Sequence, residues 1–327
     1  MKVVILTDAL GENLREDEAD TLVEVKEVQE ALLQLGHTVT VEEFSLDLPL
    51  TTRRIEESRC DLVFNLVENL SSSNLLHLVP LLCHELPVPC SGGSAYTLMM
   101  SGDKQIAKKH LALSGLPTPA WLDSASLRGA ENGTAHLESF LGIPLILKPT
   151  AQEASVGITD SSVRTFTRTA ELRSCLTGTR DSGKTGLFAE HYIDGREFNL
   201  SILPGGYILP VCEMCFVDYP TGKVRIVGYE AKWQEDSFAY QHTQRSYTFS
   251  QADAALLQKL QTLARETYQL FGNSGYARVD FRVDTHGNPF ILEMNSNPCI
   301  AHDSGFIAAA KQAGLSYAEV IELLIKI

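Results

Sequence analysis

Long apolar runs are absent from this sequence of 327 residues. The apolar run near the N-terminus, Val3 to Leu6, is too short for a signal-peptide core or a bilayer span, and no later stretch is long enough to cross a membrane. Basic residues are also few: 27 Lys and Arg stand against 41 Asp and Glu, a formal net charge of −14. The acidic balance argues against a nucleic-acid or anionic-membrane surface, although a few placed cations would suffice for a phosphate ligand.

Two glycine motifs for nucleotides are missing as well. No GxGxxG follows any predicted strand, which disfavours a nicotinamide oxidoreductase, and the P-loop pattern GxxxxGK[ST] does not occur. The seven cysteines form only one CxxC pair, Cys212 and Cys215, within the strand-like stretch YILPVCEMCF. No second pair completes a zinc site, so reduced thiols in a cytoplasmic protein are expected.

What is present begins with alternating strand and helix signals. Strand patterns and amphipathic helix patterns follow one another through the first 85 residues, which predicts a parallel, doubly wound sheet in an α/β protein. The predicted strands are Lys2–Thr7, His37–Phe44 and Asp61–Val67, and the predicted helices are Thr21–Leu35 and Leu75–Glu85.

Beyond a boundary at Gly92-Gly93 the pattern changes. A stiff linker at 115–119 separates helices from strands, and antiparallel signals dominate from Gly186 onward. The predicted elements are helices Ala95–Met100, Lys104–Leu113 and Ala254–Phe271, strand Pro144–Pro149, and a hairpin of Phe188–Ile193 with Glu197–Leu203 around Asp194-Gly195.

The most informative stretch is GYARVDFRVDTHGNPFILEMNSNP, residues 275–298. If Thr285–Asn288 forms a four-residue loop, Asp280 lies opposite Glu293, and Arg278 lies opposite Asn295. Carboxylate and amide oxygens suit Mg²⁺ bound to polyphosphate, and the guanidinium suits a charged transferring group. A hairpin with exposed charges is the alternative, and spacing alone does not separate the two.

Two weaker clusters lie upstream. Glu190 and Glu197 flank the Asp194-Gly195 turn and could accept hydrogen bonds from adenine or ribose, although charges beside a turn are usually only solvated. Lys148 ends an apolar strand and must find a partner or reach solvent. The small-residue loop Thr150–Gly157 after it, which includes Ser155, could approach phosphates.

Taken in order, these segments resemble the D-alanine–D-alanine ligase family of ATP-grasp enzymes. The resemblance spans about residues 60–315 and rests on DLVFNL, SGDKQIAKKHLALSGLPTPAW, IPLILKPTAQEASVGI, FAEHYIDGREFNLSIL, YEAKW and ARVDF…ILEMNSNP…HDSG. It implies a Rossmann-like N-terminal substrate domain (1–93), a central ATP-grasp subdomain (94–184) and a C-terminal ATP-grasp domain with the metal and nucleotide site (185–327).

The resemblance also implies roles for individual residues. ATP phosphates would be held by Lys104 and Lys148 with the loop of Ser155, adenine by Glu190, His191 and Ile193, and ribose by Glu197. Mg²⁺, as two ions that Mn²⁺ could replace, would be held by Asp280, Glu293 and Asn295. Lys232 would lie near the transferring phosphate, Arg278 would stabilise the acyl phosphate, and Ser304 would bind the acceptor carboxylate.

Several positions depart from the family pattern. The family serine and tyrosine of the first amino-acid site are Ala154 and Trp233, a phosphate-loop glycine is Glu153, and the histidine-glycine pair of the N-terminal loop is Glu68-Asn69. Cys299 replaces the glycine after Pro298. No N-terminal glutamate aligns, and Glu12 and Glu16 are the candidates.

The expected activity is therefore an ATP-dependent carboxylate–amine ligase that acts through an acyl phosphate on amino-acid-like substrates, with altered specificity. An authentic D-alanine–D-alanine ligase and a non-catalytic ATP-binding protein are the alternatives. No nucleic-acid or membrane partner is expected, and a homodimer is possible.

Overall fold

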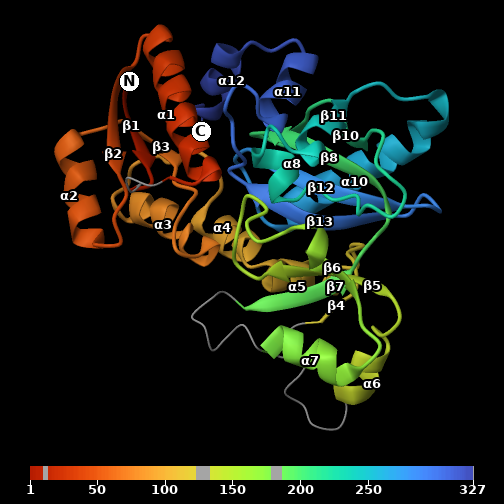
Figure 1. The fold of residues 1–327 in the computed structure, drawn as a ribbon. Coiled ribbons are helices and arrows are strands. Elements are labelled where there is room, and N and C mark those ends of the chain that lie inside the picture. The colour runs from red at the N-terminus through yellow and green to blue at the C-terminus, as the bar shows by residue number, and fades with distance from the viewer. Residues whose placement is uncertain (10–13, 123–132, 178–185, 327) are drawn as a thin grey trace.

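The computed structural model describes residues 1–9, 14–122, 133–177 and 186–326. Three separate sheets organise these residues (Figure 1), and the chain visits them in sequence order. Of the helices in the described ranges, none combines the length and apolarity needed to cross a membrane.

The first sheet is parallel, with the strand order β2-β1-β3, as the sequence predicted. Val3 to Thr7 are all buried, because elements cover both faces of the central strand. This lobe contains β1 (Lys2–Thr7), α1 (Glu16–Gln34), β2 (Thr38–Glu43), α2 (Leu48–Ser58), β3 (Leu62–Leu66), η1 (Ser73–Leu75) and α3 (Leu78–Glu85).

The second sheet is antiparallel, with the order β4-β7-β5-β6. Its own apolar core lies between the sheet and its helices and includes Leu145, Leu147, Phe166 and Leu172. The elements here are α4 (Ala95–Gly102), α5 (Lys104–Leu113), β4 (Trp121–Leu122), α6 (Gly133–Glu138), β5 (Pro144–Pro149), η2 (Asp160–Ser162), β6 (Val163–Thr165), α7 (Thr169–Thr177) and β7 (Leu187–His191).

The third sheet has six strands in the order β11-β10-β8-β12-β13, with β9 paired to β8. Cys212 and Cys215 lie on a strand with free thiols, as expected for a structural pair. The elements are β8 (Gly195–Leu203), β9 (Tyr207–Ile208), β10 (Cys212–Phe216), α8 (Tyr229–Trp233), α9 (Phe238–His242), β11 (Thr243–Ser246), η4 (Gln251–Asp253), α10 (Ala254–Leu270), β12 (Ala277–Asp284), β13 (Pro289–Ser296), α11 (Gly305–Gln312) and α12 (Tyr317–Leu324).

One predicted pairing is wrong. The segments Phe188–Ile193 and Glu197–Leu203 do not form a hairpin: β7 pairs with β4 and β5, whereas β8 pairs with β9, β10 and β12. The chain between them passes from one sheet to the next. Gly195 is required there by close approach, because a Cβ would lie 2.0 Å from the carbonyl oxygen of Val283.

Candidate active site

A cavity of about 690 Å³ is lined by residues from the segments that carry each of the three sheets. Every residue that the sequence assigned to catalysis, nucleotide or metal lines this one cavity: Lys104, Lys148, Ser155, Glu190, His191, Ile193, Glu197, Lys232, Arg278, Asp280, Glu293, Asn295 and Ser304. The predicted clusters, which are up to 200 residues apart in the sequence (Lys104 to Ser304), therefore share one site.

Two lysines converge on the buried carboxylate of Glu190. Asp103 caps α5 by accepting from the N–H groups of Gln105 and Ile106, which directs Lys104 and Lys108, one turn apart, to one face. Lys108 pairs with one oxygen of Glu190, and Lys148 of β5 lies 2.5 Å from the other. Burial opposes ionisation of Glu190, but the lysine charges outweigh it and hold its pKa below the usual value.

Lys104 bridges two other acids of the cavity. Its Nζ lies 2.9 Å from Glu293 and 3.8 Å from Glu153, and the lysine is 9% exposed. Burial alone would lower the pKa of Lys104, but these two carboxylates raise it above the usual value. Glu293 likewise keeps a pKa well below its usual value because Lys104 and Lys148 outweigh burial. Without nucleotide, Lys104 is therefore already paired with the carboxylates of Glu293 and Glu153.

The register of β12 and β13 at the site is the predicted one. Asp280 is opposite Glu293, and Arg278 is opposite Asn295. Nearer the turn, however, Val283 pairs with Pro289. If this pairing continued unbroken along the two strands, Asp280 would lie one residue out of register with Glu293. A bulge after Asp280, where Phe281 pairs with Ile291, restores the alignment. The predicted four-residue loop was therefore wrong in its pairing next to the turn, although the register at the site is confirmed.

Asp280 accepts hydrogen bonds from three side chains. Arg278 donates to both of its oxygens, at 2.7 and 2.8 Å, while Asn199 and Asn295 donate at 2.8 and 2.9 Å. Two facing carboxylates with an adjacent amide form an oxygen-rich donor set, and this chemistry fits Mg²⁺ bound to polyphosphate. Asn199 on β8 was not predicted, because nothing local in the sequence identifies it as the partner of Asp280.

A tight loop and a short helix cover the cavity. Ala154 and Ser155 both have positive φ, 56° and 58°, which is uncommon outside glycine and indicates a loop held by its contacts. The Ser155 hydroxyl donates to the Val227 carbonyl at 3.0 Å, and the Trp233 indole donates to the Ala154 carbonyl at 2.9 Å. Lys232, beside that tryptophan, has a lowered pKa because of burial and the nearby charge of Arg278.

The N-terminal lobe forms the remaining wall. Asp8, after β1, accepts from the backbone N–H groups of Glu68 and Asn69 and fixes that loop. Asp17 on α1 accepts from the Tyr229 hydroxyl of α8 at 3.1 Å. The acid that reaches the covering segment is therefore Asp17, not the sequence candidate Glu16, which is exposed; Glu12 lies outside the described residues.

Ser304 caps α11. Its hydroxyl accepts from the N–H of Ile307 at 3.2 Å and borders the cavity. It also retains a hydrogen to donate, so it can still hold a carboxylate.

Sequence reasoning missed three further charged residues, Lys108, Asp17 and Arg282. Arg282 pairs with Glu197 at 2.8 Å, and both are buried. The alternation of β12 did place Arg282 on the face of Arg278 and Asp280, so a signal was available for it. The four-residue spacing of Lys104 and Lys108 on one helix was a second available signal.

Comparisons with known proteins agree with this geometry. The family described as "D-ala D-ala ligase C-terminus" matches residues 111–326. A D-alanine–D-alanine ligase of Methylococcus capsulatus is 30% identical over 269 residues, covering 81% of this chain and 78% of the relative. One from Synechococcus sp. (strain JA-2-3B'a(2-13)) is 28% identical over 305 residues, covering 92% of this chain and 86% of the relative.

A solved structure shares the fold. The D-alanine–D-alanine ligase from Bacillus anthracis complexed with ATP superposes with a TM-score of 0.73 at 20% identity, covering 100% of this chain and 96% of that one. The chain therefore belongs to the D-alanine–D-alanine ligase family of ATP-grasp C–N ligases, which use ATP and a divalent metal.

Proposed function

We propose that this chain joins the carboxylate of an amino-acid-like donor to the amine of an acceptor through an acyl phosphate, with ATP converted to ADP and phosphate. The observation that carries the proposal is the charge arrangement of one cavity. Lys104, Lys148, Lys232 and Arg278 line it together with the facing carboxylates of Asp280 and Glu293. Such an arrangement neutralises a transferring phosphoryl group and its polyphosphate leaving group.

The nucleotide is assigned to the region where the second and third sheets meet. Lys104 and Lys148, both paired with carboxylates, are proposed to exchange these partners for ATP phosphates. His191 and Ile193 lie in and just after β7, where the chain crosses between the sheets, and are proposed to contact adenine with Glu190. Glu197 is proposed to accept from the ribose, since Arg282 holds its carboxylate in place.

Asp280, Glu293 and Asn295 are proposed to hold Mg²⁺. When bound, the ion would offset the negative charge of the polyphosphate and so permit an anionic donor to approach it. We further propose that two ions bind here and that Mn²⁺ can replace Mg²⁺.

In the first step a donor carboxylate oxygen bonds to the γ-phosphorus, and the bond from that phosphorus to the β–γ bridging oxygen breaks. Lys232 is proposed to face the transferring group, and this step depends mainly on positioning and charge. In the second step the acceptor nitrogen bonds to the acyl carbon, the carbon–oxygen bond to phosphate breaks, and the nitrogen loses a proton. Arg278 is proposed to stabilise the oxyanion, and Ser304 to hold the acceptor carboxylate.

The proposed substrates differ from two D-alanines. Ala154 offers no hydroxyl, and the Trp233 indole N–H is committed to a backbone carbonyl rather than to a substrate network. A site that loses such donors changes what it accepts. Product analysis with D-alanine and ATP tests this: a dipeptide yield equal to that of an authentic D-alanine–D-alanine ligase would favour that alternative instead.

The activity itself is tested by phosphate release across amino acids of both configurations, singly and in pairs. Release that requires a pair supports the ligase. Tight ATP binding without release for any pair would favour a non-catalytic nucleotide-binding protein.

The division into lobes 1–93, 94–184 and 185–327 also stays a proposal, supported by the three separate sheets. A cytoplasmic location is supported by the seven free cysteines. A homodimer is the proposed assembly, and light scattering of the purified chain tests it.

A further inference from the structure

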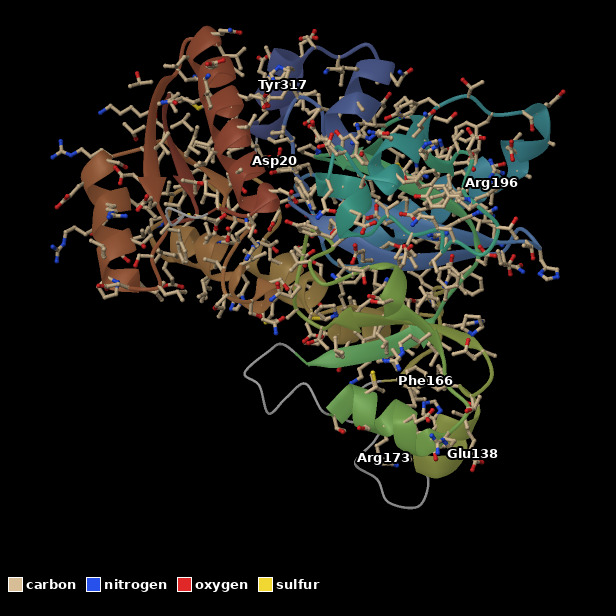
Figure 2. All side chains as sticks on the ribbon, viewed as in Figure 1. Asp20, Glu138, Phe166, Arg173, Arg196 and Tyr317 are labelled. Atoms are coloured by element: carbon tan, nitrogen blue, oxygen red, sulfur yellow. The ribbon has the colours of Figure 1, made fainter. Side chains whose placement is uncertain are left out.

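The cavity wall formed by the N-terminal lobe is strongly acidic. Asp20 of α1 and Glu68 after β3 line the cavity, and Glu24 lies one helical turn beyond Asp20. Figure 2 shows Asp20 on the side of α1 that faces the C-terminal elements. We call Asp20, Glu24 and Glu68 the acidic wall.

The acidic wall has no protein counter-charge. Among the described residues, no Lys, Arg or His forms an ion pair with any of its three members, whereas nearby Asp17 pairs with Arg15 and Glu27 with His302. Besides burial, the charges of four acids raise the pKa of Glu68: Glu24, Asp8, Asp20 and Glu153. Residues 10–13, next to this wall in the sequence, add no basic side chain.

A second observation is a half-satisfied carboxylate. Glu24 is 1% exposed, and its Oε1 accepts from the N–H of Ile300 at 2.6 Å, but its Oε2 is buried without a hydrogen-bond partner. Burial together with Asp20, Glu27 and Asp8 raises the pKa of Glu24 to about 8, and burial with its acidic neighbours raises that of Glu68. Buried polar atoms are normally paired, so the unpaired oxygen of Glu24 leaves this cluster short of one hydrogen-bond donor, a role that a cationic group can fill.

A metal ion does not fit this role. Within the described part of the chain, no three His, Cys, Asp or Glu side chains converge closely enough to hold one. The Cys299 thiol donates to Asp20 at 3.4 Å, so one carboxylate already has a weak neutral partner. An organic cation on a flexible chain can approach spaced carboxylates that cannot share one ion.

The position of the acidic wall favours the donor over the acceptor as its ligand. Glu68 and Glu153 line the same cavity, and Glu153 lies 3.8 Å from Lys104, which belongs to the proposed phosphate site. The acidic wall therefore adjoins the phosphates. The donor carboxylate must lie at the γ-phosphate, and a donor that extends from there toward the N-terminal part of the cavity would reach this wall.

We propose that the donor is an amino acid with a cationic side chain, whose ammonium or guanidinium group is bound by Asp20 and Glu68, backed by Glu24. This inference rests on the proposed ligase function. It narrows the substrate class from amino acids in general to basic ones, and it explains why Glu68 and Glu153 are compatible with binding an anionic donor group nearby.

The test compares matched donors in the phosphate-release assay. Lysine, ornithine and arginine of both configurations are set against norleucine and alanine, with each acceptor of the screen. Wild-type kcat/KM should be at least tenfold higher for the best basic donor than for norleucine, which has similar length but no charge. Equal or better use of norleucine or alanine would overturn the inference while leaving the ligase function intact.

Substitutions in the acidic wall test whether these residues bind the basic donor. Glu68→Gln and Asp20→Asn should each raise KM for the basic donor about tenfold or more, with KM for ATP within about twofold of wild type. Glu30→Gln, an exposed position on the same helix, is the matched control and should change neither. An unchanged KM for the basic donor in both wall variants would contradict the assignment.

A direct binding measurement distinguishes failure of this inference from failure of the proposed ligase function. Calorimetry with ATP present should show lysine or another basic amino acid binding more tightly than norleucine, and Glu68→Gln should remove the difference. If no pair releases phosphate, the ligase proposal fails, but this binding preference still decides the acidic wall. Equal binding of charged and neutral analogues would refute it.

Discussion

Among single side chains, Glu293 connects the lysine proposed to bind phosphate to the strand pair proposed to bind the metal. Its carboxylate pairs with Lys104 and faces Asp280 across the strand pair. We expect Glu293→Gln to lower kcat by about 100-fold or more, since it removes a fixed charge from the centre of the site. Steady-state phosphate release measures this, with Glu56→Gln on the exposed side of α2 as the control. Near-normal turnover at ordinary Mg²⁺ would remove Glu293 from the metal site.

Glu197 is assigned to binding rather than to chemistry. Because ribose contacts are equal in ground and transition states, Glu197→Gln should raise KM for ATP about tenfold, the loss of roughly 1.5 kcal/mol, and leave kcat unchanged. The amide keeps the side-chain volume beside buried Arg282, so thermal unfolding should show a folded protein. An unchanged KM for ATP would exclude a ribose contact.

Glu24 makes stability depend on pH. Its folded-state pKa of about 8 exceeds the usual value of 4.5, so the folded chain keeps a proton that the unfolded chain has lost between these pH values. The stability from this group is full below pH 4.5 and disappears as pH rises through about 8. Glu24→Gln should therefore raise the Tm of the ligand-free protein relative to wild type by about 3 °C more at pH 9 than at pH 5. A pH-independent difference would contradict the shift.

At the scale of elements, several hydrogen bonds join the loop and the helix that cover the cavity, among them those from the Ser155 hydroxyl to Val227 and from the Tyr229 N–H to Ile158. Trp233 of α8 donates to the Ala154 carbonyl, and Tyr229 of the same helix donates to Asp17. Trp233→Phe removes the first bond and keeps the ring. We expect faster hydrogen exchange in 151–158 and 229–242 without ligand, and a kcat/KM lowered about tenfold.

A matched comparison is Tyr229→Phe, which removes only the second bond. It should loosen 229–242 and leave the exchange of 151–158 closer to wild type. Identical exchange of 151–158 in wild type and Trp233→Phe would show that the indole does not hold the loop.

The elements also show how far sequence reasoning reached. The parallel first sheet, α5 and β5 follow from local periodicity, which depends only on neighbouring residues. The alignment of Asp280 with Glu293 was predicted from a four-residue loop, but the chain reaches it through a bulge. The partner of β7 and the bulge after Asp280 do not follow from local periodicity, because strand pairing is set by contacts between segments distant in sequence. The same limit hid Asp17, whose partner Tyr229 lies 212 residues further along.

At the scale of the molecule, one apolar core ties the first lobe to the end of the chain. Val28 and Leu32 of α1 share a buried cluster with Phe306 of α11 and Val320 of α12, whereas the second sheet has a core of its own. The acidic wall is thus fixed relative to Ser304. Because its core is separate, the second sheet is the part that we expect to move when ATP binds.

The central claim is that a carboxylate is phosphorylated by ATP before an amine displaces phosphate, and isotope transfer tests it most directly. A donor amino acid labelled with ¹⁸O in its carboxylate is incubated with ATP, Mg²⁺ and the acceptor, and the released phosphate is examined by mass spectrometry. The account predicts one ¹⁸O in each phosphate released, because the acyl phosphate oxygen leaves with phosphorus when nitrogen attacks carbon. Unlabelled phosphate released together with the joined product would contradict it.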